Sequence, residues 1–105
     1  MHFIICGTDG DDPEALNRRM AARDSHMAYS EMAVKTGEQV IAAATLNAEG
    51  NMNGSVMIVE FDDIDGVKEW LDQEAYVTGN VWHEVKIYPC KIGPSFQHLI
   101  KKTIN

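Results

Sequence analysis

One long run, from Pro13 to Thr36, constrains the fold of this chain more than any other stretch. Asp12-Pro13 has the chemistry of a helix start, because an aspartate can cap the first turn and proline is tolerated there. Gly37 has the chemistry of a helix end. Between them, one stripe recurs at helical spacing: Leu16, Met20, Arg23, Met27 and Val34. The run is predicted to be a single helix that turns this stripe, Arg23 included, toward the interior.

Short segments on both sides of this run predict the strands of a sheet. Residues 2–8 and 55–61 each contain four consecutive apolar residues, as expected for strands that are buried on both faces. Residues 40–46 are rich in alanine, but the stop at Gly37 and the turn at 47–54 favour a strand. Residues 81–91 alternate, with Val81, His83, Val85, Ile87 and Pro89 on one face and Trp82, Glu84, Lys86 and Tyr88 on the other.

A second, shorter helix is predicted after the acidic cap at 62–65, with an inward stripe of Val67, Trp70 and Leu71. Residues 74–80 are interpreted as a connection. The order of elements is then β-α-β-β-α-β. This is the ferredoxin-like plan of an α+β protein, an antiparallel sheet with two helices on one face.

The predicted domain covers residues 1–92, and residues 93–105 form a tail that is expected to hold a short docked helix. The sheet face without helices is too apolar for water, since it includes Met57 or Ile58, Val85 or Tyr88, and Ile4 or Ile5. We therefore expect a homodimer that packs sheet to sheet. The alternative is that the tail covers this face within one chain.

Charge and composition exclude several classes of function. The net charge of -7 argues against binding to nucleic acids and to anionic membrane surfaces. The apolar run 3–6 is too short for a signal peptide or a membrane span, so we expect a cytoplasmic protein with reduced cysteines. No metal site is predicted, because no zinc-ligand spacing occurs among His2, His83, His98, Cys6 and Cys90.

Arg23 and His26 form the centre of the candidate site. They lie three residues apart, so on a helix their side chains are neighbours. An arginine that is turned inward needs an anionic partner, and a carboxylate such as Glu74 could satisfy it and orient the imidazole. Histidine exchanges protons near pH 7, which suits general acid/base catalysis. The same three groups could instead form a buried network that only holds the fold together.

Other polar residues have a structural and a functional interpretation each. Glu74 and Asp72, at the end of the second helix, could face the site or be solvated acids. Tyr76 could lend a hydroxyl to a ligand or cover the helix end with its ring. Ser55, after Gly54, could bind a substrate or serve as a turn residue.

Three segments together resemble the YCII-related (YciI-like) family of dimeric α+β barrel proteins. They are Arg23-x-x-His26-Met27, Gly54-Ser55 at a strand start, and Trp70-Leu71-x-x-Glu74-Ala75-Tyr76-Val77-x-Gly79. The resemblance covers roughly residues 2–92. It implies that His26 and a carboxylate form a catalytic pair. Glu74-Ala75-Tyr76 stands where the family has Asp-Pro-Tyr, and the sequence does not choose between Glu74 and Asp72 as the partner of His26.

The resemblance also implies a reaction class. It suggests cofactor-free elimination, isomerisation or dehalogenation of a small aromatic or lactone-like compound, with Arg23 binding an anionic group of the substrate. One alternative is a non-catalytic dimeric module that binds a ligand or assists another protein. A third hypothesis, cofactor-free oxygenation as in related monooxygenase barrels, depends on fold analogy alone.

Overall fold

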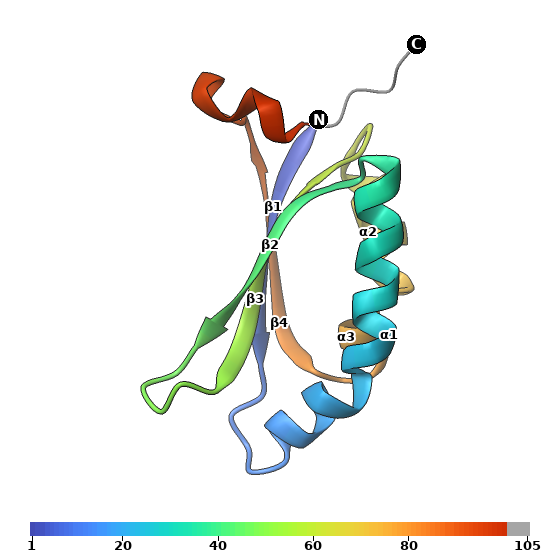
Figure 1. Cartoon of the computed structure of the whole chain (residues 1–105). Helices are drawn as coiled ribbons and strands as arrows, with labels where there is room; N and C mark the ends of the chain where they lie inside the picture. Colours follow the sequence, from blue (N-terminus) through green and yellow to red (C-terminus); the bar gives the residue numbers. More distant parts are fainter. Residues whose placement is uncertain (101–105) are drawn as a thin grey trace.

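The computed structural model describes residues 1–100 and shows a four-stranded antiparallel sheet covered on one face by helices (Figure 1). The strands are β1 (His2–Asp9), β2 (Gln39–Leu46), β3 (Met52–Glu60) and β4 (Trp82–Cys90), in the order β2-β3-β1-β4. The helices are α1 (Ala15–Thr36), α2 (Ile64–Asp72) and the single turn α3 (Ala75–Thr78), which lies inside the predicted connection 74–80. The predicted ferredoxin-like α+β fold is confirmed.

The ends of the helices follow from their sequences. Helix α1 begins at Ala15, two residues after Pro13, and stops at Gly37, which adopts a left-handed conformation with φ 87°. The carboxylate of Asp63 caps α2 by accepting a hydrogen bond from the backbone N–H of Gly66.

The predicted inward stripe of α1 is wrong. Met20 is 52% exposed and Met27 is 42% exposed, and Leu16, Arg23 and Val34 are exposed as well. The helix turns the preceding positions inward: Arg19, Ala22, His26 and Ala33, together with Tyr29. A shift of one residue rotates the face by about 100°. Because the inner face of α1 holds charged and polar side chains, an apolar stripe could not mark it.

The core lies between the helices and one face of the sheet. It is built from strand residues Phe3, Ile5, Met57 and Val59 and from the predicted stripe of α2, Val67, Trp70 and Leu71. Tyr29 of α1 ties the helices together, since its ring stacks on Trp70 and its hydroxyl donates a hydrogen bond to the Trp70 carbonyl. This packing fixes α1 and α2 relative to the sheet.

Trp82 is on the opposite face of β4 from the one that strict alternation predicts. The pairing of β1 with β4 shifts register between Thr8 and Asp9, so that Trp82 lies opposite Asp9 and is buried on the helix side. Its indole ring lies over Gly7, where a Cβ atom would be 2.5 Å from Cε2 of the ring. Glycine at position 7 therefore makes room for Trp82.

The open face of the sheet is apolar, and the register identifies its residues. Ile4 pairs with Ile58 on one side and Tyr88 on the other, so these three side chains share the face away from the helices. Val56 and Tyr88 on this face are exposed. The described part of the tail forms a 3-10 helix, η1 (Pro94–Leu99), beside one end of the sheet (Figure 1). It leaves these residues uncovered, and residues 101–105 of the predicted tail lie outside the described residues.

Candidate active site

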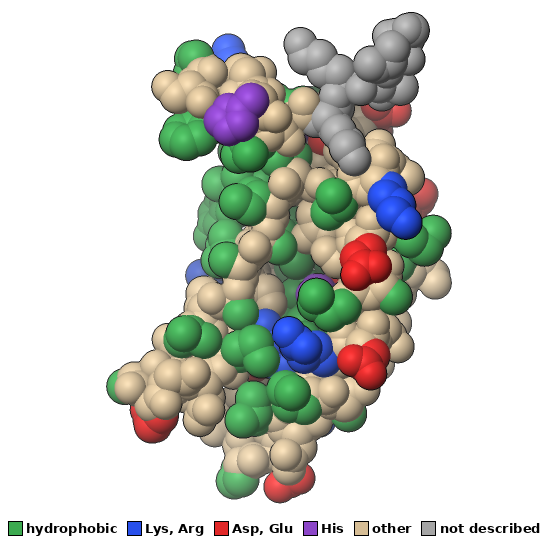
Figure 2. All heavy atoms as spheres, in the orientation of Figure 1, with side chains coloured by type: hydrophobic (Ala, Val, Ile, Leu, Met, Phe, Trp, Pro, Cys, Tyr) green, Lys and Arg blue, Asp and Glu red, His purple; other side chains and the backbone are tan. Residues whose placement is uncertain are grey.

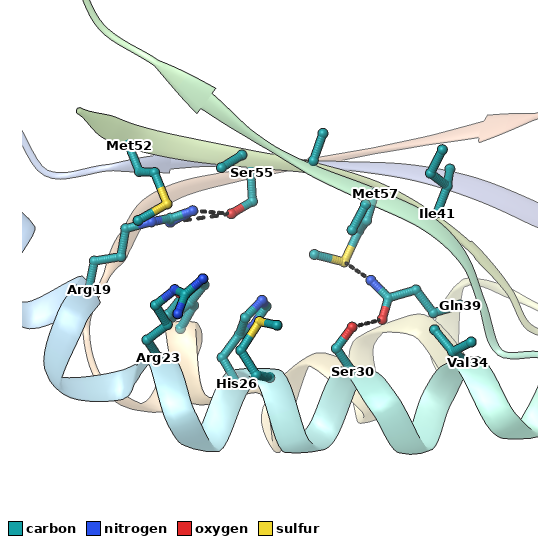
Figure 3. Close-up of a pocket in the computed structure, with 15 residues that line it drawn as sticks. Arg19, Arg23, His26, Ser30, Val34, Gln39, Ile41, Met52, Ser55 and Met57 are labelled. Carbon is teal, nitrogen blue, oxygen red and sulfur yellow. Dashed lines mark hydrogen bonds between the residues drawn. The ribbon is translucent and has the colours of Figure 1, made fainter. Parts of the chain in front are cut away.

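A pocket of about 360 Å³ lies between α1 and strands β2 and β3 (Figure 3). Figure 2 shows basic and hydrophobic side chains next to each other where this face is hollowed between the helix and the sheet. The polar lining comes from both layers: Arg19, Arg23, His26, Ser30, Gln39 and Ser55. The remaining walls are mostly apolar, from Met27, Val34, Ile41, Met52 and Met57 and the alanines of β2.

His26 and Glu74 meet in the structure. Nδ1 of His26 lies 2.5 Å from Oε1 of Glu74, and His26 points from α1 into the pocket (Figure 3). A carboxylate that accepts a hydrogen bond from Nδ1 holds the proton on that nitrogen, so Nε2 becomes the basic nitrogen. Nε2 has no hydrogen-bond partner among the described residues. The imidazole therefore offers its free nitrogen to a ligand.

Glu74, and not Asp72, is the carboxylate of this site. Its side chain is completely buried, whereas Asp72 is exposed at the end of α2. Glu74 is also the N-cap of α3, because its Oε1 accepts a hydrogen bond from the backbone N–H of Tyr76 at 3.1 Å. One oxygen thus orients both the imidazole and the turn that carries Tyr76.

The aromatic ring of Tyr76 is part of the pocket wall. It stacks on His26, with ring centroids 3.8 Å apart, and Trp82 meets both rings edge-on. Burial raises the pKa of the Tyr76 hydroxyl, although Arg19 and Arg23 act in the opposite direction. Tyr76 therefore fixes the plane of the imidazole and remains a neutral phenol at physiological pH.

Arg19 is the buried cation of the site, and sequence reasoning missed it. Its guanidinium donates hydrogen bonds to Oγ of Ser55 at 2.7 Å and to the carbonyl of Gly54 at 2.8 Å, and it lies 4.6 Å from the centre of the Tyr76 ring. Nη1 also lies 3.4 Å from Oδ1 of Asp9. The available signal was its position, seven residues and thus two turns before His26.

The prediction that Arg23 points to the interior is wrong, but Arg23 does line the pocket. Its side chain is exposed and is directed toward the cavity (Figure 3). Within residues 1–100 it makes no hydrogen bond or ion pair, so its guanidinium is available to an anionic group. Arg19 is thus a buried positive charge that holds elements of the fold together, and Arg23 is a positive charge that a ligand can reach.

Ser55 lies opposite the helix at the end of the pocket where the two arginines are found. Its Oγ accepts hydrogen bonds from Arg19 and from Nε1 of Trp82, the latter at 3.3 Å. Both guanidinium nitrogens contribute, Nη2 at 2.7 Å and Nη1 at 3.3 Å, so three N–H groups share the two lone pairs of the hydroxyl. The O–H group of Ser55 therefore remains available to donate a hydrogen bond.

Two buried carboxyl groups, those of Asp9 and Glu74, contribute to the electrostatics of the site. Oδ2 of Asp9 and Oε2 of Glu74 have no hydrogen-bond partner among the described residues. Burial raises the pKa of Asp9, while the charges of Arg19 and Arg18 lower it. No group of three or more histidine, cysteine or acidic side chains within residues 1–100 could hold a metal ion, and no helix there could span a membrane.

The YCII-related domain matches residues 1–91. The chain belongs to the YCII-related family. The predicted resemblance to this family is confirmed.

Two curated relatives match this YCII-related protein over nearly all of their own length. Protein YciI of Escherichia coli is 26% identical over 97 residues, which cover 87% of this chain and 97% of the relative. An uncharacterized protein of Haemophilus influenzae is 26% identical over 98 residues, with the same coverage.

A solved structure has the same fold. It is the 5-chloro-2-hydroxyhydroquinone dehydrochlorinase (TftG) of Burkholderia phenoliruptrix in complex with 2,5-dihydroxybenzoquinone. It matches this YCII-related chain with a TM-score of 0.79 and 23% identity, over 90% of this chain and 98% of the other.

Proposed function

We propose that this YCII-related protein is a small-molecule enzyme in which His26 performs general acid/base chemistry on a ligand in the pocket. The observation that supports it is the 2.5 Å contact between Nδ1 of His26 and a fully buried carboxylate, on a histidine that lines the pocket. In this arrangement Nε2 is the base, and Glu74 orients the ring and stabilises the imidazolium that forms.

The reaction that fits these groups begins with proton removal from the ligand by Nε2. The electron pair of the broken bond forms a new double bond. In an elimination, a leaving group such as chloride on the neighbouring carbon departs with the electron pair of its own bond. In an isomerisation, the π pair of a neighbouring carbonyl moves onto its oxygen, and the proton returns at another carbon as that pair moves back. These outcomes are elimination, dehalogenation and isomerisation, and none requires a cofactor. Negative charge that develops on a ligand oxygen is stabilised by Arg23 and by the O–H of Ser55.

The ligand class follows from the pocket and is supported by the structural neighbour. An accessible cation at one end and walls that are mostly apolar suit a small planar compound with an acidic oxygen substituent. The neighbour is a dehydrochlorinase that was solved with a quinone. We therefore propose a small oxygenated aromatic or quinone-like compound, or a lactone-like one, as substrate.

The second candidate function is a non-catalytic module that binds such a ligand. It is favoured by the burial of Arg19 and Glu74, since both link elements of the fold through hydrogen bonds. In that case the cluster of His26, Glu74 and Arg19 stabilises the protein and no turnover occurs.

Exchange of ligand protons for deuterium distinguishes the catalytic function from the non-catalytic one, and it is measured with several classes of compound. The protein is incubated in D₂O with enolisable carbonyl compounds, chlorinated hydroquinones and lactones, and deuterium incorporation and chloride release are followed by NMR and ion chromatography. A reaction that falls about 10²- to 10⁴-fold in His26→Asn supports catalysis. Asp72→Asn is the matched control and should keep full activity. A reaction that persists in His26→Asn, or no reaction with any compound class, contradicts the proposal.

Assembly and location belong to the same proposal. We propose a homodimer that packs through the open sheet face around Ile4, Ile58 and Tyr88, and a cytoplasmic location. The exposed apolar side chains of this face support the dimer.

A further inference from the structure

Gln39 is a buried amide that reaches the pocket from the first position of β2. Only 3% of the residue is exposed, and it is among the residues that line the cavity. It enters the site from the end away from Arg19 and Arg23 (Figure 3). No part of the acid/base chemistry above uses it.

The contacts of the amide fix which way it faces. Its Oε1 accepts a hydrogen bond of 2.6 Å from Oγ of Ser30, and its Nε2 lies 3.7 Å from Sδ of Met57. A thioether sulfur can accept a hydrogen bond but has no hydrogen to donate. The amide nitrogen, and not the oxygen, must therefore face Met57 and the cavity.

This leaves the amide nitrogen poorly satisfied. An amide nitrogen has two N–H donors, and the only acceptor that Nε2 has in the described part of the chain is a weak one. A buried donor without a good acceptor is costly, and proteins usually pair such groups. An oxygen atom of a ligand in the pocket would supply the missing acceptor.

We infer that Gln39 is a specificity-determining residue that donates a hydrogen bond from Nε2 to a neutral acceptor oxygen of the ligand, opposite the group bound by Arg23. This inference deepens the proposed function, on which it rests. It narrows the ligand class to compounds with two oxygen functions on opposite ends of an apolar body. One is acidic and lies at the arginine end, and the other is a carbonyl or ether oxygen at the Gln39 end.

Two compounds of nearly equal shape test the acceptor. In 4-acetylbenzoate a carbonyl stands opposite the carboxylate, and in 4-isopropylbenzoate a methyl group replaces the carbonyl oxygen. Their dissociation constants are measured by NMR titration of the wild-type protein and of three variants, Gln39→Leu, Ser30→Ala and Gln73→Leu. Gln73 is the matched control, because it lies at the end of α2 and does not line this pocket.

The inference predicts that the wild type binds the acetyl compound about five- to tenfold more tightly than the isopropyl compound, as one hydrogen bond allows. The preference should fall below twofold in Gln39→Leu and persist in Gln73→Leu. Ser30→Ala, which loses only the group that orients the amide, should show an intermediate preference. Equal binding by the wild type, no binding of either compound, or a preference retained in Gln39→Leu would overturn the inference.

A measurement on the wild type alone keeps the test valid if Gln39→Leu does not fold. The side-chain NH₂ resonances of Gln39 should shift with 4-acetylbenzoate and stay in place with 4-isopropylbenzoate; equal shifts would contradict the inference. His26→Asn separates the two proposals. It should keep the preference for the acetyl compound while it loses proton exchange, so failure of the acid/base function and failure of the Gln39 contact give different results.

Discussion

Nη2 of Arg19 lies 2.7 Å from Oγ of Ser55, and this hydrogen bond joins α1 to β3 inside the protein. Both residues are buried, and the same guanidinium faces Asp9 and the ring of Tyr76. The buried guanidinium of Arg19 therefore links the helix and the strand that form this wall of the pocket.

Replacement of Arg19 by methionine should destabilise the protein strongly. The variant removes the charge that compensates Asp9 and the donors to Ser55, and the loss of one partner of a buried pair costs about 3–5 kcal/mol. Urea unfolding measures the free energy. The matched control is Arg23→Met, which should change stability by less than about 0.5 kcal/mol because Arg23 is exposed. Equal losses in the two variants would contradict the role given to Arg19.

Replacement of Gly7 by alanine should disturb Trp82. The added Cβ would lie 2.5 Å from Cε2 of the indole, so the ring has to move, at a cost of about 1–3 kcal/mol. Thermal unfolding and tryptophan fluorescence report both effects. Gly93→Ala is the control, since its Cβ would meet only an ordinary contact at 3.6 Å from Phe96. An unchanged emission spectrum in Gly7→Ala would show that Trp82 is not packed there.

The ion pair of Asp12 and Arg18 predicts a dependence of stability on pH. The hydrogen bond from Arg18 holds the pKa of Asp12 well below its ordinary value of 3.8. A lowered pKa in the folded state stabilises the protein fully above that ordinary value, and the contribution decreases as the pH falls from about 4 toward the folded-state pKa. Asp12→Asn should therefore lower the melting temperature slightly at pH 7 and by a smaller amount at pH 2, where part of the contribution has been lost. A difference of the same size at both pH values would rule out the charge as its cause.

The proposed dimer predicts that a charge on the open sheet face separates the subunits. Val56 lies on that face, opposite Cys6 of β1 and Ala43 of β2. Light scattering across a dilution series should give a dimer for the wild type and a monomer for Val56→Lys. Val77→Lys, equally exposed but on α3, should remain a dimer. A wild-type protein that is monomeric at every concentration would contradict the proposed assembly.

The order of strands and helices could be predicted because each element has a local signature. Gly37 ends α1 through its left-handed conformation, and Asp63 caps α2 through its side chain. The contact between His26 and Glu74 could be anticipated from the resemblance to the family. The structure then identifies Glu74, and not Asp72, as the carboxylate that contacts His26, because only Glu74 is turned inward, at the N-cap of α3.

The inner face of α1 and most of the pocket could not be predicted. Hydrophobic periodicity finds the buried face of a helix only when that face is apolar, and here it includes Arg19 and His26. Trp82 was misplaced because a register shift interrupts the alternation of β4. Gln39 has no sequence signature, since its burial depends on how β2 packs against Ser30 of α1.

The protonation pattern of His26 tests the central claim most directly. Long-range ¹H–¹⁵N NMR spectra distinguish a ring nitrogen that carries a proton from one that does not. In the neutral wild-type protein, Nδ1 should carry the proton and Nε2 should be free, and Glu74→Gln should weaken this preference. A proton on Nε2 in the wild type, or a pattern that Glu74→Gln leaves unchanged, would contradict the assignment of His26 as a base oriented by Glu74.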